Sequence, residues 1–164
     1  MQSVSRDNVL AAVPPVVVKR LGLVQYEPIW HAMRSFSASR TAATADEIWL
    51  LEHHPVYTLG VAGRLAHLPR AANDIPVVRI DRGGQITYHG PGQLVVYLLL
   101  DMKRRGLNVR PLVRLMETAV IDLLERYGVH AVGRLDAPGV YVNGAKVAAL
   151  GLRVIKLRNV VEDF

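Results

Sequence analysis

The spacing of hydrophobic and polar residues predicts a first strand followed by two amphipathic helices. Residues 16–23 (VVVKRLGL) are rich in β-branched side chains and predict a strand. Apolar residues recur every three or four positions over 26–40 and again over 109–127, the period of a helix with one apolar face. Gly128 is expected to end the second helix in a left-handed conformation. The apolar face of that helix is expected to comprise Leu112, Leu115, Met116, Ala119, Val120, Leu123 and Leu124.

Several strands are predicted between and after these helices. Residues 47–52 and 56–59 are two strand-like segments separated by His53, His54 and Pro55, and proline lacks the N–H that a strand ladder uses. Residues 92–100 form a strongly apolar segment, which is typical of a central strand.

The last predicted element is a hairpin of residues 139–142 and 146–154 around Asn143-Gly144, a pair suited to a tight turn. Strands and helices therefore occur in mixed order, without strict βαβ alternation. This order predicts an α+β (mixed α/β) fold with helices packed on one side of a mixed sheet, in a single domain spanning 1–164.

The composition is that of a globular domain. Of 164 residues, 51% are hydrophobic and 21% are charged, which argues against a disordered or fibrous chain. The longest apolar runs are too short to cross a bilayer, and the N-terminus lacks a signal-peptide pattern, so we expect a cytoplasmic protein with no membrane partner. The chain has no cysteine, which excludes disulfides, thiolate metal sites and thiol nucleophiles from these residues.

The formal net charge of +6 raises the possibility of nucleic-acid binding. The basic residues are scattered, however, and the one cluster of three, at 103–105, has no interleaved aromatic residues. We therefore expect a solvated loop and no nucleic-acid partner. A modest basic surface would also suit an acidic protein partner.

Candidate chemistry is densest in residues 82–93 (RGGQITYHGPGQ). Four glycines would let the backbone approach a ligand closely, and polar side chains of several kinds lie between them. The segment lacks the Gly-Lys-Ser/Thr ending of a phosphate loop, and His89 has no second ligand at a metal spacing. Two ordinary hairpin turns with polar surface residues would explain the same pattern, so the residues alone leave both interpretations open.

Two further candidates are Lys146 and the pair His53-His54. Lys146 lies among small and apolar residues, where burial would lower the pKa of its ammonium and suit it to proton transfer. A strand-edge lysine that extends into water explains the pattern at least as well. The histidine pair beside Pro55 is interpreted as a strand end.

Three segments together resemble the lipoyl(octanoyl) transferases. These are RGGQITYHGPGQ at 82–93, LLEHHPVYTLG at 50–60 and APGVYVNGAKVAALGLR at 137–153. The resemblance extends from about Leu21 to Val154. It implies a fold similar to the biotin/lipoate protein ligase catalytic domain, a mixed sheet flanked by helices.

The resemblance also implies an activity. The family transfers an octanoyl group from octanoyl-acyl carrier protein to a lysine of apo lipoyl domains, in 2-oxoacid dehydrogenases and the glycine cleavage H protein. It uses neither ATP nor a metal cofactor, and the acyl group passes through a cysteine thioester. Lys146 matches the family lysine that lowers the pKa of this cysteine. The residues that match the acyl-binding pocket are Arg82, Gly83, Gly84, Gln85, Ile86, Thr87, Tyr88, His89, Ala149, Leu150 and Gly151.

This sequence departs from the family pattern at its end. Residues 155–164 (IKLRNVVEDF) match neither the expected strand nor the segment with the catalytic cysteine. We therefore expect an incomplete domain that lacks C-terminal strands, with little or no transferase activity. The alternatives are an ATP-dependent lipoate or biotin protein ligase and a non-catalytic binder of acyl groups or lipoyl domains.

Overall fold

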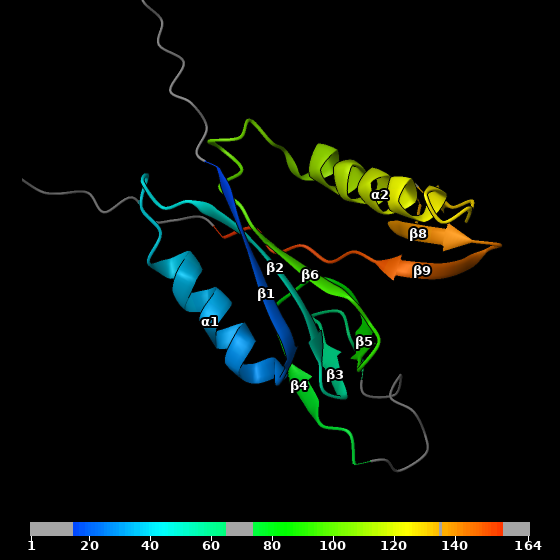
Figure 1. Ribbon diagram of the computed structural model, residues 1–164. Coiled ribbons are helices and arrows are strands. Elements are labelled where there is room, and N and C mark those ends of the chain that lie inside the picture. Colours follow the sequence, from blue (N-terminus) through cyan, green and yellow to red (C-terminus); the bar gives the residue numbers. More distant parts are fainter. Residues whose placement is uncertain (1–14, 65–73, 135, 156–164) are drawn as a thin grey trace, which may run out of the picture.

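The computed structural model describes residues 15–64, 74–134 and 136–155. The sequence also predicts a loop over 63–74; most of this loop, and the segment 156–164, lie outside the described residues. The elements in chain order are β1 (Val16–Val24), α1 (Tyr26–Ala38), β2 (Asp46–His53), β3 (Val56–Leu59), β4 (Val77–Arg79), β5 (Ile86–His89), β6 (Val95–Leu99), α2 (Val109–Glu125), β7 (Val132–Gly133), β8 (Gly139–Val142) and β9 (Ala145–Ala149). The predicted α+β class is confirmed, but the prediction that the helices pack on one side was wrong, because α1 and α2 lie on opposite sides of the strands (Figure 1).

The first sheet has the strand order β1-β2-β6. Strand β1 pairs with β2 in parallel, and α1 forms the crossover that a parallel pair requires. Strand β6 pairs with β2 in antiparallel orientation and places Tyr97 opposite Trp49. The ring of Phe36 in α1 packs edge-on against Trp49, with centroids 6.3 Å apart, and fixes the helix to the central strand.

The second sheet has the order β4-β3-β5. The chain bends at His54 and Pro55, so the two segments that the sequence placed around this proline belong to different sheets. Strand β5 is antiparallel to β3, and this register places Thr87 opposite Thr58. The middle of the glycine-rich segment 82–93 is thereby fixed against the buried strand β3.

The third sheet, β7-β8-β9, contains the predicted hairpin. Asn143 and Gly144 have φ angles of 50° and 79°, as a tight turn requires. Helix α2 packs on β7 and β8, and its buried Glu117 accepts a hydrogen bond of 2.9 Å from the backbone N–H of Gly139. Strand β9 ends at Ala149, earlier than the predicted end at residue 154.

Two predictions about burial were wrong. Strand β6 is at the edge of its described sheet, and β2 is the central strand. The apolar residues of β6 line cavities instead of packing between two neighbouring strands. In α2, the predicted apolar face is divided: Leu112 is buried, but Leu115 and Leu123 are 57% and 46% exposed.

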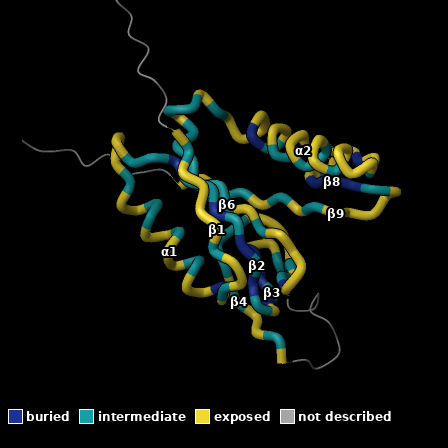
Figure 2. Tube along the Cα trace, in the orientation of Figure 1, coloured by how far each residue is buried: buried dark blue, intermediate teal, exposed yellow. Residues whose placement is uncertain are grey.

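The buried core follows β2, β3 and β8 (Figure 2). Its apolar residues are Tyr26, Trp49, Leu51, Val56, Leu59, Leu112, Ala131, Val140 and Tyr141. In the part of the chain that the structure describes, no helix is both long enough and apolar enough to span a membrane.

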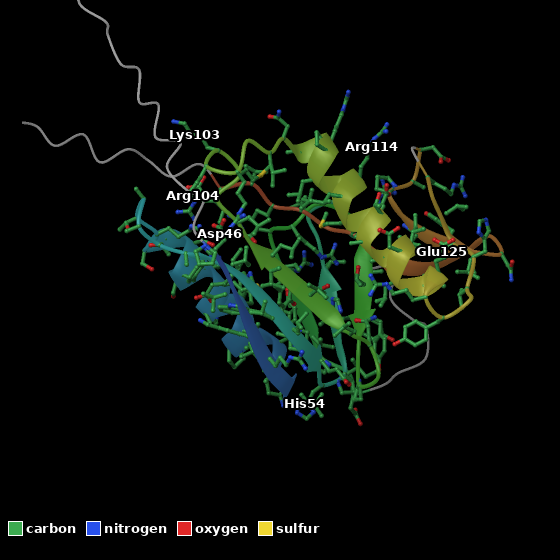
Figure 3. The ribbon with its side chains drawn as sticks, turned by 45° about the horizontal axis from the view of Figure 1, so that its top comes forward. Asp46, His54, Lys103, Arg104, Arg114 and Glu125 are labelled. Carbon is green, nitrogen blue, oxygen red and sulfur yellow. The ribbon has the colours of Figure 1, made fainter. Side chains whose placement is uncertain are left out.

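A buried charge cluster connects α1, β2 and the turn after β6. Asp46 is fully buried, and its carboxylate forms ion pairs with Arg40, Arg104 and Arg105. It also accepts a hydrogen bond of 2.8 Å from the backbone N–H of Asp101. Figure 3 shows Arg104 beside Asp46. Two of the three basic residues at 103–105 therefore pair with an internal carboxylate, so the expectation of a solvated loop was wrong for Arg104 and Arg105.

Candidate functional site

Two cavities meet around Arg82, between α1, β6 and the segment after β9. Their volumes are about 230 Å³ and about 270 Å³. The residues that line both are Tyr26, Arg82, Val96, Tyr97 and Gly151. Because they share this wall, the cavities form two adjoining compartments of one site.

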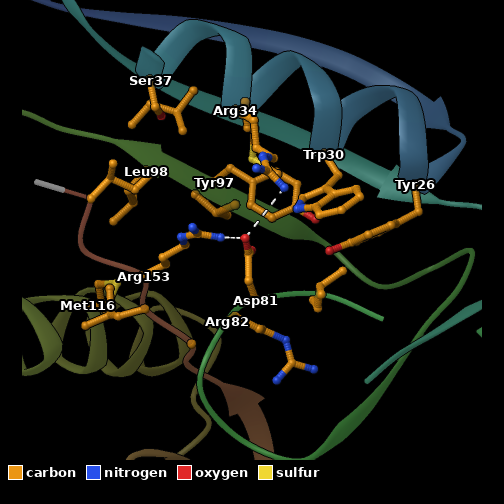
Figure 4. A pocket seen from close by; sticks show the side chains of 17 residues that line it. Tyr26, Trp30, Arg34, Ser37, Asp81, Arg82, Tyr97, Leu98, Met116 and Arg153 are labelled. Carbon is orange, nitrogen blue, oxygen red and sulfur yellow. Dashed lines mark ion pairs between the residues drawn. The ribbon is translucent and has the colours of Figure 1, made fainter. Parts of the chain in front are cut away.

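The first cavity is mainly apolar. Helix α1 contributes Trp30 and Met33, strand β6 contributes Leu98 and Leu99, and helix α2 contributes Met116. Figure 4 shows these elements converging on the space beside Tyr97. Such a lining suits a hydrocarbon group, since burying each methylene contributes about 0.8 kcal/mol.

An ionic cluster also lines the first cavity. Asp81 forms ion pairs with Arg34 of α1, at 3.6 Å, and with Arg153, which follows β9 (Figure 4). These side chains are partly exposed, so the ion pairs contribute little to stability. They nevertheless connect three segments that are far apart in the sequence.

The second cavity is more polar. Thr87 and His89 project from the same face of β5, and Gln93 follows in the next turn. Across the cavity lies the final part of the third sheet, lined by residues 147–151. This wall consists of small and apolar side chains.

The Arg82 guanidinium organises the polar wall. Its Nη2 atom donates to the Thr58 carbonyl oxygen at 3.1 Å and to the hydroxyl oxygens of Thr58 and Thr87, each at 2.8 Å. Its Nη1 atom donates to the Gly83 carbonyl oxygen at 2.9 Å. Burial lowers the pKa of Arg82 but leaves it charged at neutral pH.

His89 has a tautomer that its neighbours determine. The Gln93 amide nitrogen donates to the Tyr88 carbonyl oxygen, so its Oε1 atom accepts from His89 Nδ1–H at 2.7 Å. His89 Nε2 is then an acceptor and faces the Thr58 hydroxyl at 3.4 Å. Burial, with the charge of Arg82, lowers the pKa of His89 and keeps the ring neutral.

His53, the last residue of β2, lies behind the cavity wall and lines neither cavity. It is fully buried; its Nδ1 atom lies 3.1 Å from the Val24 carbonyl oxygen and its Nε2 atom 2.9 Å from the Tyr97 hydroxyl. Its ring also contacts the rings of Tyr26 and His89, at 5.0 Å and 5.9 Å between centroids. Burial lowers the pKa of His53, raises that of Tyr97, and raises that of Tyr26 to about 12.

The structure brings together six of the residues singled out from the sequence. They line the second cavity and are Arg82, Thr87, His89, Ala149, Leu150 and Gly151. The other described members of that set, Gly83, Gly84, Gln85, Ile86 and Tyr88, line neither of these two cavities. Strand alternation turns Ile86 and Tyr88 to the opposite face of β5, where the Tyr88 ring lies 5.4 Å from that of Tyr57.

Lys146 lies on β9, and its side chain is exposed. Its ammonium donates to the Pro138 carbonyl oxygen at 3.2 Å and lies 5.3 Å from the centroid of the Tyr141 ring. The structure therefore places it outside both cavities, near the wall formed by residues 147–151. This arrangement is the strand-edge lysine that the sequence analysis gave as the alternative to a buried one.

Sequence reasoning missed three residues of this site, Tyr26, Thr58 and Tyr97, and set aside a fourth, His53. His53 was interpreted only as a strand end, although the buried positions Trp49 and Leu51 of β2 continue to residue 53 with a period of two. That alternation could have identified a histidine in a core position. Tyr97 had no such local signal, because its role depends on pairing between distant strands.

No metal centre is evident in the described residues, where no three His, Asp or Glu side chains could jointly hold an ion. The polar groups that line the second cavity are instead hydroxyls, one imidazole, one amide and one guanidinium. They suit hydrogen bonding to a neutral polar group next to an apolar chain.

The fold is that of the lipoate ligase class. The structure of a lipoate-protein ligase A bound with ATP shares the fold, with a TM-score of 0.56 and 20% identity over 77% of this chain and 53% of that one. The profile of the family described as "Lipoyl protein ligase A/B catalytic domain" matches residues 25–161. This family match continues past Val154, the residue at which the resemblance based on the three motifs was expected to end.

Curated relatives narrow this class. An octanoyltransferase of Azoarcus sp. (strain BH72) is 69% identical over 140 residues, which are 85% of this chain and 62% of the relative. One of Dechloromonas aromatica (strain RCB) is 61% identical over 140 residues, covering 85% of this chain and 68% of the relative. The chain belongs to the lipoyl protein ligase A/B catalytic domain family, among its octanoyltransferases. It spans about three fifths of the length of the first of these relatives.

Proposed function

We propose that this chain supplies the acyl-binding region of an octanoyltransferase of lipoic-acid biosynthesis in the cytoplasm. The donor would be octanoyl-acyl carrier protein, and the acceptor would be a lysine of an apo lipoyl domain, in a 2-oxoacid dehydrogenase or a glycine cleavage H protein. The observation that supports this most directly is an apolar cavity that adjoins a polar one at Arg82. An octanoyl chain would occupy the apolar compartment, and the reacting carbonyl would lie toward the polar one.

The proposed pathway of the acyl group requires a thiol. In transfer through a thioester, a cysteine sulfur attacks the octanoyl carbonyl and displaces the carrier thiol, and the acceptor amine then displaces the cysteine. The 164 residues contain no cysteine, so they cannot form that intermediate by themselves. We therefore expect them to bind octanoyl ligands without turning them over.

Lys146 is proposed to act on that thiol. Its ammonium would stabilise a nearby thiolate, which is the nucleophilic form. In a protein that contains both groups, Lys146→Ala should slow acylation but leave octanoate binding unchanged. Lys146→Arg should preserve part of the rate, because it keeps the positive charge. Equal acylation rates in all three proteins would refute this role.

The acyl-binding proposal can be tested by calorimetry with octanoate and acetate. The purified chain should bind octanoate well above acetate, because only the longer chain fills the apolar cavity. Met116→Ala should weaken octanoate binding, whereas Leu115→Ala, at an exposed position of the same helix, should not. Equal affinity for octanoate and acetate would contradict the proposal.

An ATP-dependent ligase is the second candidate function, because this chain shares its fold with the ATP-bound lipoate-protein ligase A. It predicts release of pyrophosphate from ATP when octanoate or lipoate is added. Octanoate binding with no pyrophosphate release would favour the transferase. Binding of an apo lipoyl domain without transfer would instead fit a non-catalytic binder.

A further inference from the structure

Tyr97 occupies a position where a ligand in either cavity can reach it. It projects from β6 and lines both compartments, together with Arg82 on the opposite wall (Figure 4). Tyr97 lies outside the glycine-rich segment 82–93 and is not among the site residues that the sequence singled out. A hydroxyl at the junction of an apolar and a polar cavity would meet the first polar group that follows an acyl chain.

The direction of the hydrogen bond on Tyr97 follows from its neighbours. The Val24 carbonyl oxygen can only accept, so His53 must carry its proton on Nδ1, 3.1 Å away. Burial keeps His53 neutral, which leaves Nε2 as a lone-pair acceptor. The Tyr97 hydroxyl therefore donates its only proton to His53 Nε2, at 2.9 Å.

This arrangement leaves the Tyr97 oxygen as an acceptor. Among the described residues, its hydroxyl has one hydrogen-bond partner, His53. The tyrosine is partly buried, and the fully buried His53 holds it from behind. A phenol whose proton is already used can satisfy a ligand that donates, but cannot serve a ligand that only accepts.

The charge near Tyr97 determines which kind of hydrogen-bond donor the Tyr97 oxygen can accept from. The Arg82 guanidinium lines the same two cavities, and its positive charge acts on Tyr97. Among the described residues, no carboxylate lines the second cavity, and the Asp81 carboxylate of the first cavity is paired with Arg34 and Arg153. An ammonium group would be repelled by Arg82 without a counter-charge in that compartment, whereas a neutral N–H would not.

We propose that Tyr97, positioned by His53, accepts a hydrogen bond from a neutral amide N–H of the acyl donor. This inference rests on the proposed function, because it requires an octanoyl group in the adjoining cavity. The amide closest to the thioester in the cysteamine part of an acyl carrier arm has the required chemistry. Tyr97 would then distinguish a carrier-bound octanoyl thioester from free octanoate, and His53 would act as a positioning residue.

The test is a matched pair of ligands, titrated into the full 164-residue chain. One is S-octanoyl-N-acetylcysteamine, and the other has an ester oxygen in place of its amide N–H. The amide ligand should bind roughly three- to ten-fold more tightly, the usual range for one neutral hydrogen bond. Tyr97→Phe should abolish this preference, and His53→Leu should reduce it.

Tyr57→Phe is the matched control, because Tyr57 packs against Tyr88 and lines neither cavity. It should keep the preference of the unmodified chain. If Tyr97→Phe does not fold, the ligand pair with the unmodified chain still decides the question. Equal affinity for the two thioesters, or tighter Tyr97-dependent binding of octylamine, would overturn the inference while the proposed function stands. Failure of octanoate itself to bind would instead overturn the proposed function.

Discussion

One oxygen of the buried Asp46 carboxylate lies 2.7 Å from Nη2 of Arg104, a residue 58 positions later in the chain. Arg40 and Arg105 pair with the same carboxylate. The start of the central strand β2 is thereby connected to the end of α1 and to the turn after β6. A long-range cluster of this kind should be important for stability, because each partner is costly to leave unpaired in the interior.

We therefore predict that Asp46→Asn destabilises the fold by roughly 3 kcal/mol or more, since it removes the negative charge that three guanidinium groups share. Urea denaturation would measure the loss. Asp136→Asn is the control, because Asp136 and its partner Arg134 are 69% and 48% exposed. Its effect on the free energy of unfolding should be small, because an exposed ion pair contributes little to stability. Equal destabilisation by the two substitutions would show that burial does not strengthen the role of Asp46.

Asp46 should also make stability depend on pH. Burial raises the pKa of its carboxyl, but the hydrogen bonds from Asp101 and the three arginines outweigh burial and lower the pKa from 3.8 to about 2. The folded state therefore binds fewer protons than the unfolded state between these values. The stabilisation of about 2 kcal/mol is complete above about pH 5 and is lost as pH falls through about 2. The stability difference between the unmodified chain and Asp46→Asn should shrink accordingly between pH 6 and pH 2.5.

Local patterns in the sequence predicted the elements but not the way they meet. The strand at Val16–Val24, the helix at Tyr26–Ala38 and the turn at Asn143-Gly144 follow from residue period and turn chemistry. The separation of β2 and β3 into two sheets depends on pairing with distant strands. The apolar character of β6 is real, but it lines cavities between helices, which hydrophobic period alone cannot distinguish from burial in a sheet.

The sequence predicted only part of the candidate site, because local patterns do not specify which distant segments meet. The family resemblance pointed to Arg82, Thr87 and His89, which do line one cavity. It also included Tyr88, because a contiguous motif does not specify which side chains alternate to the other face of a strand. The partners of Arg82 on β3 come from the antiparallel register, which the sequence alone did not supply.

Arg82→Lys should separate charge from geometry. A lysine keeps the positive charge but cannot reproduce the donors by which Arg82 binds Thr58, Thr87 and Gly83 at once. We predict a loss of about 1–3 kcal/mol in stability and a weaker affinity for octanoate. Arg79→Lys, at an exposed position of β4, is the control and should change neither quantity. Unchanged octanoate affinity in Arg82→Lys would show that its hydrogen bonds do not shape the cavities.

Gly60 should tolerate a side chain less well than Gly83, although only Gly83 is among the residues that the resemblance assigns to the acyl-binding pocket. A Cβ at Gly60 would lie 2.5 Å from the Gly84 carbonyl oxygen and 3.0 Å from that of Arg82, where the end of β3 meets the glycine-rich segment. Gly60→Ala should therefore displace that segment, destabilise the fold by about 1–3 kcal/mol and weaken octanoate binding. Gly83→Ala is the matched control, because a Cβ there meets no atom within 4 Å. Denaturation and calorimetry on both variants would decide; equal effects would mean that the close approach at Gly60 does not position Arg82.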